Sequence, residues 1–249
     1  MKKGEFIVNG KSSLDFNTFI QHRPIIEAPI RKIDRRESIG IDGYVMVDGG
    51  HYKDSNLKLM LYTMDGDRKA YDVRSEIYSL FNTGDYVKVR FYFDPNKNYY
   101  VALSEEAVRF ENKYYFEESQ TWELPLSVYP WKEITDVEPI EIESSATIRN
   151  EYQDPSLPLI YVLSTEANKR IRITINGKKF DLNTVSTTSG TYIDSDMMDV
   201  YRKSGNVYYS ENINYVAKGF PVLKPGRNDI SVTGPVSKVV IDPRWRVLV

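Results

Sequence analysis

The stretch RIRITINGKKFDL, from Arg170 to Leu182, decides how the second half of the chain folds. Its isoleucines at positions 171, 173 and 175 alternate with Arg172 and Thr174, which is the period-two pattern of a strand with one buried face. Asn176-Gly177 follows at once and is the strongest short signal for a hairpin turn. Phe180-Asp-Leu182 then returns as the partner strand. The stretch therefore predicts an antiparallel β-hairpin.

The same kind of pattern continues on both sides of this hairpin. Short alternating segments bounded by turn residues recur at regular spacing, which is typical of a β-sandwich. The sequence therefore predicts a sandwich domain over residues 146–249. The further strands expected in it are Ala146–Ile148, Leu159–Leu163, Thr191–Ile193, Val200–Arg202, Val207–Tyr209, Asp229–Val232 and Val236–Ile241.

One amphipathic helix is expected in the first half, over Asp72–Gly84. Val73, Ile77, Leu80 and Phe81 fall on one face at helical spacing. Asp72 is a suitable N-cap, and the residues from Asn82 supply a stop. The pattern predicts a helix of about three turns.

Strand patterns dominate the rest of the first half, so residues 1–134 are expected to form an α+β domain of antiparallel sheets with one helix. Turns are expected at Asp48–Gly50, Asp94–Asn98 and Glu111–Lys113. The segment 135–145 is rich in Glu and is interpreted as a linker. The expected strands are Phe6–Val8, Leu14–Ile20, Tyr44–Val47, Leu57–Met64, Tyr86–Phe93, Tyr99–Leu103, Val108–Phe110 and Tyr114–Val128.

Composition excludes several classes of function. The formal net charge is −2, so there is no basic excess for binding nucleic acid. Cysteine is absent, which removes disulfides, thiolate nucleophiles and zinc–thiolate sites and fits folding in a reducing cytoplasm. The first residues, MKKGEFIVNGKSS, lack the apolar run of a signal peptide. No apolar stretch approaches the length of a membrane span.

Acidic and serine residues are the candidates for chemistry, and none forms a recognisable site. Asp194, Asp196 and Asp199 have a spacing that suits Ca²⁺, but the glycine and glutamate of an EF-hand loop are missing. Neighbouring glutamates such as Glu105-Glu106 would point to opposite faces of a strand and could not line one cleft. There is no G-x-S-x-G motif. We therefore expect no enzyme activity, no metal and no cofactor.

Tyrosines are the main candidates for binding in the second half. Tyr208 and Tyr209 are adjacent on an expected strand, so one of them should face outward. An exposed tyrosine, or Trp245, could stack on a sugar in the manner of a carbohydrate-binding module. An exposed tyrosine is equally typical of a protein–protein interface, and the sequence leaves both readings open.

A third feature is GFPVLKPGRNDISVTG, from Gly219 to Gly234. Pro225-Gly226 predicts a tight turn, and Ile230 and Val232 re-enter the core. Lys224 and Arg227 would then lie at an exposed tip, where contact with a partner stays open.

These motifs, in their order and spacing, resemble the distal tail protein (Dit) family of long-tailed, non-contractile phages over nearly the whole chain. No single motif carries the resemblance. The stretches that do are Phe6–Phe16, His22–Ile33, Gly40–Asp54, Asp72–Phe81 and Trp122–Ile134 in the first half, and Ile171–Leu182, Thr191–Asp196, Phe220–Val232 and Ile241–Leu248 in the second.

The resemblance implies a non-enzymatic tail hub. Residues 1–134 would form a homo-hexameric ring, single or back to back, with a central channel for DNA. Residues 146–249 would form a galectin-like or carbohydrate-module-like sandwich. The implied partners are the major tail-tube protein, a tail-associated lysin or fibre protein, and a receptor-binding or upper baseplate protein. The implied location is the virion tail tip, after assembly in the bacterial cytoplasm.

The long strand expected from Tyr114 to Val128 is our candidate for an element that crosses to a neighbouring subunit, because a closed ring needs heterologous contacts. The candidate interface residues are Tyr115, Trp122, Tyr208, Tyr209, Lys224 and Arg227. The alternative function is a carbohydrate-binding module that contacts saccharides of the host cell wall.

Overall fold

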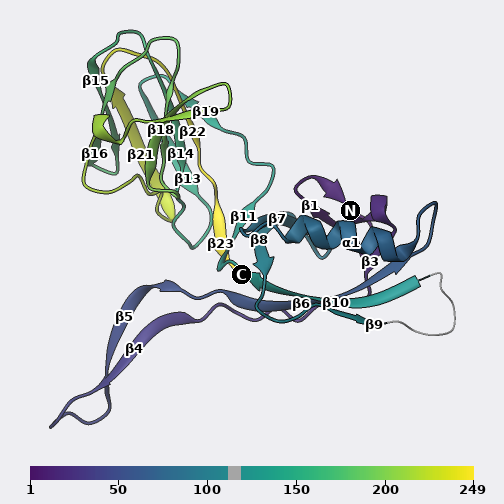
Figure 1. Cartoon of the computed structure of the whole chain (residues 1–249). Coiled ribbons are helices and arrows are strands. Elements are labelled where there is room, and N and C mark those ends of the chain that lie inside the picture. The colour runs from purple at the N-terminus through teal and green to yellow at the C-terminus, as the bar shows by residue number, and fades with distance from the viewer. Residues whose placement is uncertain (112–118) are drawn as a thin grey trace. The chain divides into compact units, whose positions relative to one another are not determined.

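The computed structural model describes residues 1–111 and 119–249. The chain divides into two compact units, coloured along the chain in Figure 1. The first unit contains Met1–Thr135 together with Leu248–Val249, and the second contains Asp136–Val247. Strands dominate both units, and the described residues hold one α-helix. The prediction of a mainly β protein with a single helix is confirmed.

The first unit is built on an antiparallel sheet with the strand order β2-β1-β7-β8-β10-β6-β3. Off this path, β9 pairs with β10 and β11 pairs with β8. The bounds are β1 (Phe6–Val8), β2 (Lys11–Ser12), β3 (Thr18–Ile20), β6 (Ser55–Met64), β7 (Val87–Phe91), β8 (Asp94–Leu103), β9 (Arg109–Glu111), β10 (Ser119–Val128) and β11 (Trp131–Ile134).

The core of this unit lies between the sheet and helix α1 (Ala70–Phe81). Val73, Ile77 and Phe81 are buried on one helix face, as their spacing predicts. They pack in one cluster with alternate residues of β6 and β10, such as Leu59 and Leu124. Burial of these side chains is the main stabilising contribution to the unit.

The helix begins earlier than its sequence pattern predicts. Its first residue is Ala70, and Asp72 lies in the first turn rather than at the cap. The Ala70 amide donates a hydrogen bond of 2.6 Å to the Asp65 carboxylate. A carboxylate from the preceding loop thus satisfies a free amide and opposes the positive end of the helix dipole.

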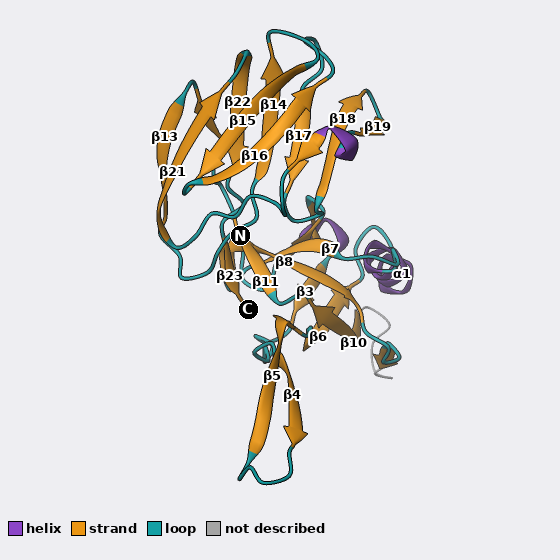
Figure 2. Cartoon of the chain, turned by 90° about the vertical axis from the view of Figure 1, so that its left-hand side faces the viewer, coloured by secondary structure: helices purple, strands orange, loops and turns teal. Residues whose placement is uncertain are grey.

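A separate two-stranded hairpin interrupts the first unit between β3 and β6. Its strands are β4 (Arg31–Glu37) and β5 (Tyr44–Tyr52), drawn as a ribbon pair in Figure 2. The expected turn at Asp48–Gly50 is wrong, because these residues lie inside β5, where the register with β4 shifts between the pairs Ile33↔Asp48 and Arg31↔Tyr52. Two glycines in a row read locally as a turn, but here they form an irregularity inside the strand: Gly50 has a φ of 73°, and its amide donates to Asp48 Oδ1 at 2.9 Å.

Two other local predictions need correction. The segment Leu14–Ile20 is not one strand, because a 3₁₀ helix, η1 (Ser13–Phe16), precedes β3. The turn between β7 and β8 lies at Tyr92-Phe93 rather than at Asp94–Asn98, since Phe91 already pairs with Asp94. Two further predictions fall largely outside the described residues, which resume with β10. They are the turn Glu111–Lys113 and the start of the long strand Tyr114–Val128.

The second unit is a sandwich of two antiparallel sheets. One sheet has the order β12-β22-β14-β17-β18-β19 and the other β13-β21-β15-β16-β20. The bounds are β12 (Ile140–Ile142), β13 (Ser145–Asn150), β14 (Leu159–Ser164), β15 (Lys169–Ile175), β16 (Lys178–Thr184), β17 (Thr191–Asp194), β18 (Asp199–Ser204), β19 (Val207–Ser210), η2 (Asn212–Asn214), β20 (Tyr215–Val216), β21 (Gly226–Thr233) and β22 (Val236–Asp242). The last strand, β23 (Arg246–Leu248), follows.

The opening hairpin forms as its sequence predicts. β15 pairs with β16 from Lys169↔Thr184 to Ile175↔Lys178, and Ile171, Ile173 and Ile175 are buried. Asn176 and Gly177 both have positive φ, at 51° and 80°, which is the geometry of a type I′ turn. The segment interpreted as a linker contains a strand, because β12 pairs with β22.

Candidate interaction surfaces

The hairpin of β4 and β5 is the most exposed element of the first unit, and we call residues 31–52 the arm. Every residue from Arg31 to His51 is exposed. Large apolar side chains are among them, and Ile39 is fully exposed. A lone two-stranded hairpin is marginally stable, and such exposed apolar groups mark interaction sites. The exposed apolar residues of the arm are Ile33, Ile39, Ile41, Tyr44, Val45, Met46 and Val47.

Apolar side chains lie on both faces of the arm. Ile33, Tyr44 and Met46 share one face through the pairs Ile33↔Asp48, Arg35↔Met46 and Glu37↔Tyr44, while Val45 and Val47 occupy the other. At the base of the arm, Arg31 Nε donates to Asp48 Oδ1 at 2.9 Å. Hydrogen bonds from Arg31 lower the pKa of Asp48 to about 2. The base therefore carries an exposed ion pair, and the apolar residues beyond it are exposed as well.

Trp122 is removed from the interface candidates because it is fully buried. It lies on β10 in the core of the first unit, with Leu124 and Leu126. Trp122 Nε1 donates to Thr63 Oγ1 at 3.0 Å. The alternation of Trp122, Leu124 and Leu126 indicates one apolar strand face, but only the elements packed on that face decide that it is buried. Tyr115, the other candidate on this segment, lies outside the described residues.

One edge of the sandwich gathers exposed apolar residues from β19, η2 and β20, and we call it the sandwich edge. Both Tyr208 and Tyr209 are exposed, at 63% and 46%. The expectation that only one of them faces outward is too narrow, because β19 is the last strand of its sheet and nothing covers its outer side. Val207, Ile213 and Val216 extend the surface.

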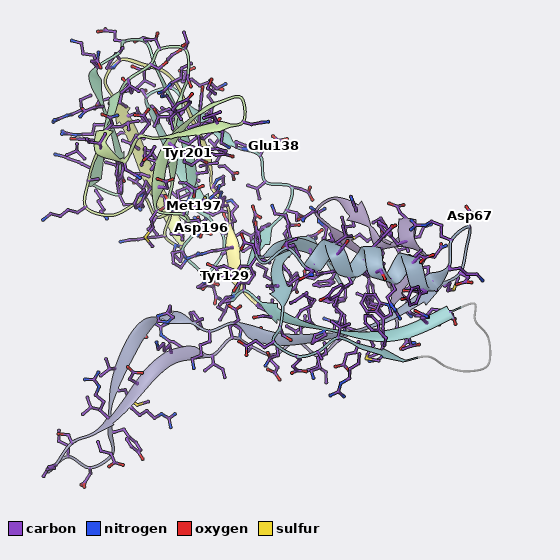
Figure 3. The ribbon with its side chains drawn as sticks, viewed as in Figure 1. Asp67, Tyr129, Glu138, Asp196, Met197 and Tyr201 are labelled. Atoms are coloured by element: carbon purple, nitrogen blue, oxygen red, sulfur yellow. The ribbon has the colours of Figure 1, made fainter. Side chains whose placement is uncertain are left out.

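Tyr208 also ends a row of tyrosines on the outer face of the six-stranded sheet. The rings of Tyr161, Tyr192, Tyr201 and Tyr208 follow one another at centroid distances of 5.0, 5.3 and 5.4 Å. Tyr201 is labelled in Figure 3. The Tyr192 and Tyr201 rings are nearly parallel, at 16°. Lys203 Nζ lies 5.0–5.4 Å from the centroids of three of these rings.

This stacking limits where a sugar could bind. The faces of Tyr192 and Tyr201 that look at each other are covered, so they cannot take a pyranose ring. Trp245 is also buried, at 8% exposure. Of the candidates for stacking, Tyr208 and Tyr209 remain exposed, and a cation lies over each ring: Lys203 Nζ is 5.0 Å from the Tyr208 centroid and the Arg202 guanidinium 5.4 Å from that of Tyr209.

The tip that carries Lys224 and Arg227 is held by one buried side chain. Asn228 is fully buried; its Oδ1 accepts from the Lys224 amide, and its Nδ2 donates to the Lys224 carbonyl, both at 2.8 Å. Asn176 Nδ2 also donates to Asn228 Oδ1 at 2.8 Å, which ties the tip to the β15–β16 turn. Lys224 and Arg227 are both exposed on this fixed loop. Arg227 Nε donates to Asp229 at 2.8 Å.

The acidic cluster considered for Ca²⁺ forms an ion pair instead. Asp194 is buried and accepts two hydrogen bonds from the Arg244 guanidinium, at 2.8 and 3.1 Å. Burial acts to lower the pKa of Arg244, but these bonds outweigh it and raise that pKa. Asp194 also accepts from the amides of Asp196 and Met197, both labelled in Figure 3. Its oxygens are thus engaged in ordering a turn.

The described residues offer no assembled metal centre, since no three His, Cys, Asp or Glu side chains in residues 1–111 and 119–249 are placed to hold an ion. In the same part of the chain, no helix has the length and apolar character to cross a membrane. The candidate sites that remain are surfaces: the arm, the sandwich edge and the tip.

Comparison with solved structures identifies the architecture. The chain is similar to the Dit (gp 19.1) protein of phage SPP1, described as a hub of the adsorption apparatus in phages that infect Gram-positive bacteria, with 16% identity and a TM-score of 0.68 over 95% of this chain and 97% of that chain. It is also similar to a chain of the phage p2 baseplate in its activated conformation with Sr, at 8% identity and a TM-score of 0.61 over 95% of this chain and 96% of that one.

A third likeness is to the phage p2 baseplate with Ca, at 9% identity and a TM-score of 0.59 over 97% of each chain. No known family profile matches the sequence. No curated protein sequence matches it either. The likeness is therefore one of fold, and it spans both units: the chain has the fold of the phage hub protein Dit over nearly its whole length.

Proposed function

We propose that this protein is a structural hub of a phage tail tip. The observation that carries the proposal is the whole-chain likeness to the SPP1 Dit protein, which includes both units and covers 97% of that chain. Sharing one unit alone would be weak support, because a β-sandwich serves many unrelated functions. A likeness that spans two different units in the same order is stronger support for a hub role.

In this proposal the first unit assembles into a homo-hexameric ring with a central channel that lets DNA pass. The exposed apolar residues of the arm support assembly, because a hairpin with no buried residue gains stability when a neighbour covers it. The ring would join the tail tube to a tail-associated lysin or fibre protein. It would act in the virion after assembly in the host cytoplasm.

The second unit would display peripheral proteins. Its sandwich edge combines Tyr208, Tyr209 and Ile213, all exposed. Aromatic and apolar groups of this kind are enriched at the centres of protein interfaces. A receptor-binding or upper baseplate protein is the proposed partner, and no catalytic role is assigned to either unit.

The experiment is size-exclusion chromatography with light scattering on the purified protein at micromolar concentration, followed by negative-stain electron microscopy. We expect a mass of six or twelve times the 28.9 kDa chain and six-fold rings with a central pore. A particle that stays at 28.9 kDa and shows no ring, both alone and mixed with its tail-tube protein, would contradict the proposal.

A further inference from the structure

The outer face of the five-stranded sheet in the second unit is polar and mostly basic. All residues of this unit are described. Strand register brings Arg149, Arg170, Arg172, Lys179 and Arg227 onto this face. The same registers bring two carboxylates, those of Asp181 and Asp229. Positive charge therefore exceeds negative charge on these strands, although the whole chain is slightly acidic.

Two arginines stand directly opposite each other on this face. Arg149 on β13 pairs in register with Arg227 on β21. Both side chains are about 70% exposed, at 71% and 70%. Like charges directly opposite on neighbouring strands destabilise a sheet. Each has an acidic neighbour two residues on, Glu151 at 2.9 Å and Asp229 at 2.8 Å, but both pairs are exposed and weak. An anion between the two guanidinium groups would relieve their repulsion.

An open hollow of about 530 Å³ lies on the same strands, and its lining includes the pair Thr147↔Asp229 but not the two arginines themselves. Four hydroxyl groups line it, from Ser145, Thr147, Thr174 and Ser231, together with the Asp229 carboxylate. Thr147 Oγ1 donates to Asp229 Oδ1 at 2.7 Å, so this carboxylate is already engaged by Thr147 and Arg227. Hydrogen bonds from both partners lower the pKa of Asp229. The hollow thus presents hydroxyl groups, and Thr147 and Asp229 in its lining each lie two residues from one arginine of the pair on the same strand.

We infer that this face binds an anionic carbohydrate polymer, one whose repeating units carry hydroxyl groups together with phosphate or carboxylate groups. Arginine forks bind either anion through two parallel hydrogen bonds. The serine and threonine hydroxyls suit the hydroxyls of a sugar or polyol, since each can donate and accept. The two chemistries lie side by side, as they do in such a polymer.

The same face argues against other ligands. A protein partner would need an apolar or aromatic centre, whereas Val216, opposite Asp181 at one edge, is the apolar side chain that shares this face. A single-stranded nucleic acid or a neutral sugar would need an aromatic ring for stacking, and the strand residues that share this face are Ser, Thr, Arg, Lys, Asp, Asn and Val. The inference is independent of the proposed ring, because it concerns one face of one chain.

The test is calorimetric titration of the full chain with poly(glycerol phosphate) and with polygalacturonate, which distinguish phosphate from carboxylate as the anion. We expect saturable binding of at least one polymer. Arg149→Gln combined with Arg227→Gln should weaken it tenfold or more. The control, Lys218→Gln combined with Lys238→Gln, removes the same charge from other parts of the second unit and should leave the affinity unchanged.

Thr174→Val, which keeps the shape and removes one hydroxyl group, should weaken polymer binding several-fold. Thermal melts of each variant verify that it is folded. Absence of binding by both polymers would overturn the inference, as would equal losses in the two double variants, which would indicate attraction by net charge alone. Binding of poly-glutamate or duplex DNA as tightly as either carbohydrate polymer would also overturn it.

Discussion

At the residue scale, Trp122 shows how a polar atom is accommodated in the core of the first unit. Trp122, Thr63 and Thr18 are all fully buried. Thr18 donates its hydroxyl proton to the Phe16 carbonyl at 2.9 Å, so in its 2.9 Å contact with Thr63 it must act as acceptor. Thr63 therefore donates to Thr18 and accepts from the Trp122 indole. The direction of the whole chain of hydrogen bonds is fixed.

We predict that Thr63→Val destabilises the first unit by about 2 kcal/mol, because it leaves the buried indole N–H without an acceptor. Urea unfolding followed by tryptophan fluorescence measures the change. Trp122→Phe removes the donor but leaves a smaller ring in the core. When Thr63→Val and Trp122→Phe are combined, the hydrogen bond is lost once rather than twice, so the loss of unfolding free energy should be smaller than the sum of the two single losses. A double-mutant cycle with strictly additive effects would show that the bond contributes nothing.

At the element scale, the arm combines an ion pair at its base with exposed apolar residues beyond it. Tyr44 and Met46 share a face with Ile33 and are exposed by 57% and 54%. Because these side chains contact little within the chain, their replacement should change assembly and leave the fold intact.

We predict that Tyr44→Ser combined with Met46→Ser weakens the oligomer. The protein concentration at which it dissociates should be at least tenfold higher than for the unaltered protein. The melting temperature of a diluted, dissociated sample should not change. Light scattering across a dilution series measures the first quantity. Met197→Ser combined with Met198→Ser, at two residues each 70% exposed in the sandwich, is the control for lost apolar surface. If both variants assemble alike, the arm is not a subunit contact.

At the scale of the whole molecule, the first unit is assembled from both ends of the chain. Leu248 and Val249 belong to it, although more than one hundred residues of sandwich separate them from Thr135. The Val249 amide donates to the Pro130 carbonyl at 2.9 Å. The Val249 side chain packs against the core cluster that contains Trp122. The unit is therefore discontinuous in sequence.

We predict that removing Leu248 and Val249 lowers the stability of the first unit by about 1–2 kcal/mol, from partial loss of apolar burial and of backbone hydrogen bonds such as that from Val249 to Pro130. Urea unfolding monitored at the tryptophans of this unit provides the measurement. Replacing Val249 by Ala, which keeps the backbone donor, should cause only part of the loss. A truncated chain as stable as the full one would mean that the C-terminal residues only rest on the unit.

Local patterns in the sequence predicted most of the strands and the helix, but fewer of the pairings between strands. The Ile171–Ile175 alternation and the Asn176-Gly177 turn predicted the central hairpin, because both depend on neighbouring residues. The spacing of Val73, Ile77 and Phe81 predicted the helix for the same reason. The arm was only half predicted, since β4 is rich in charge and its pairing with β5 across Gly49 and Gly50 is not a local property.

The candidate surfaces divide in the same way. Exposure of Lys224 and Arg227 follows from a turn that the sequence itself encodes through Pro225 and Gly226. Burial of Trp122 and exposure of both Tyr208 and Tyr209 depend instead on which strands lie inside a sheet and which lie at its edge. The basic face was not predicted, because its arginines come from strands far apart in the sequence.

The sequence by itself determined a mainly β chain with one helix, free of cysteine, with a hairpin at Asn176-Gly177 and a sandwich built around it. Tertiary structure alone decided that Trp122 is core, that Asp194 pairs with Arg244, and that Arg149 faces Arg227. The physical reason is the distance along the sequence over which each interaction acts. Periodicity and turn chemistry act over a few residues, whereas burial, edge position and cross-strand neighbours are set by the register of segments that meet only in the folded chain.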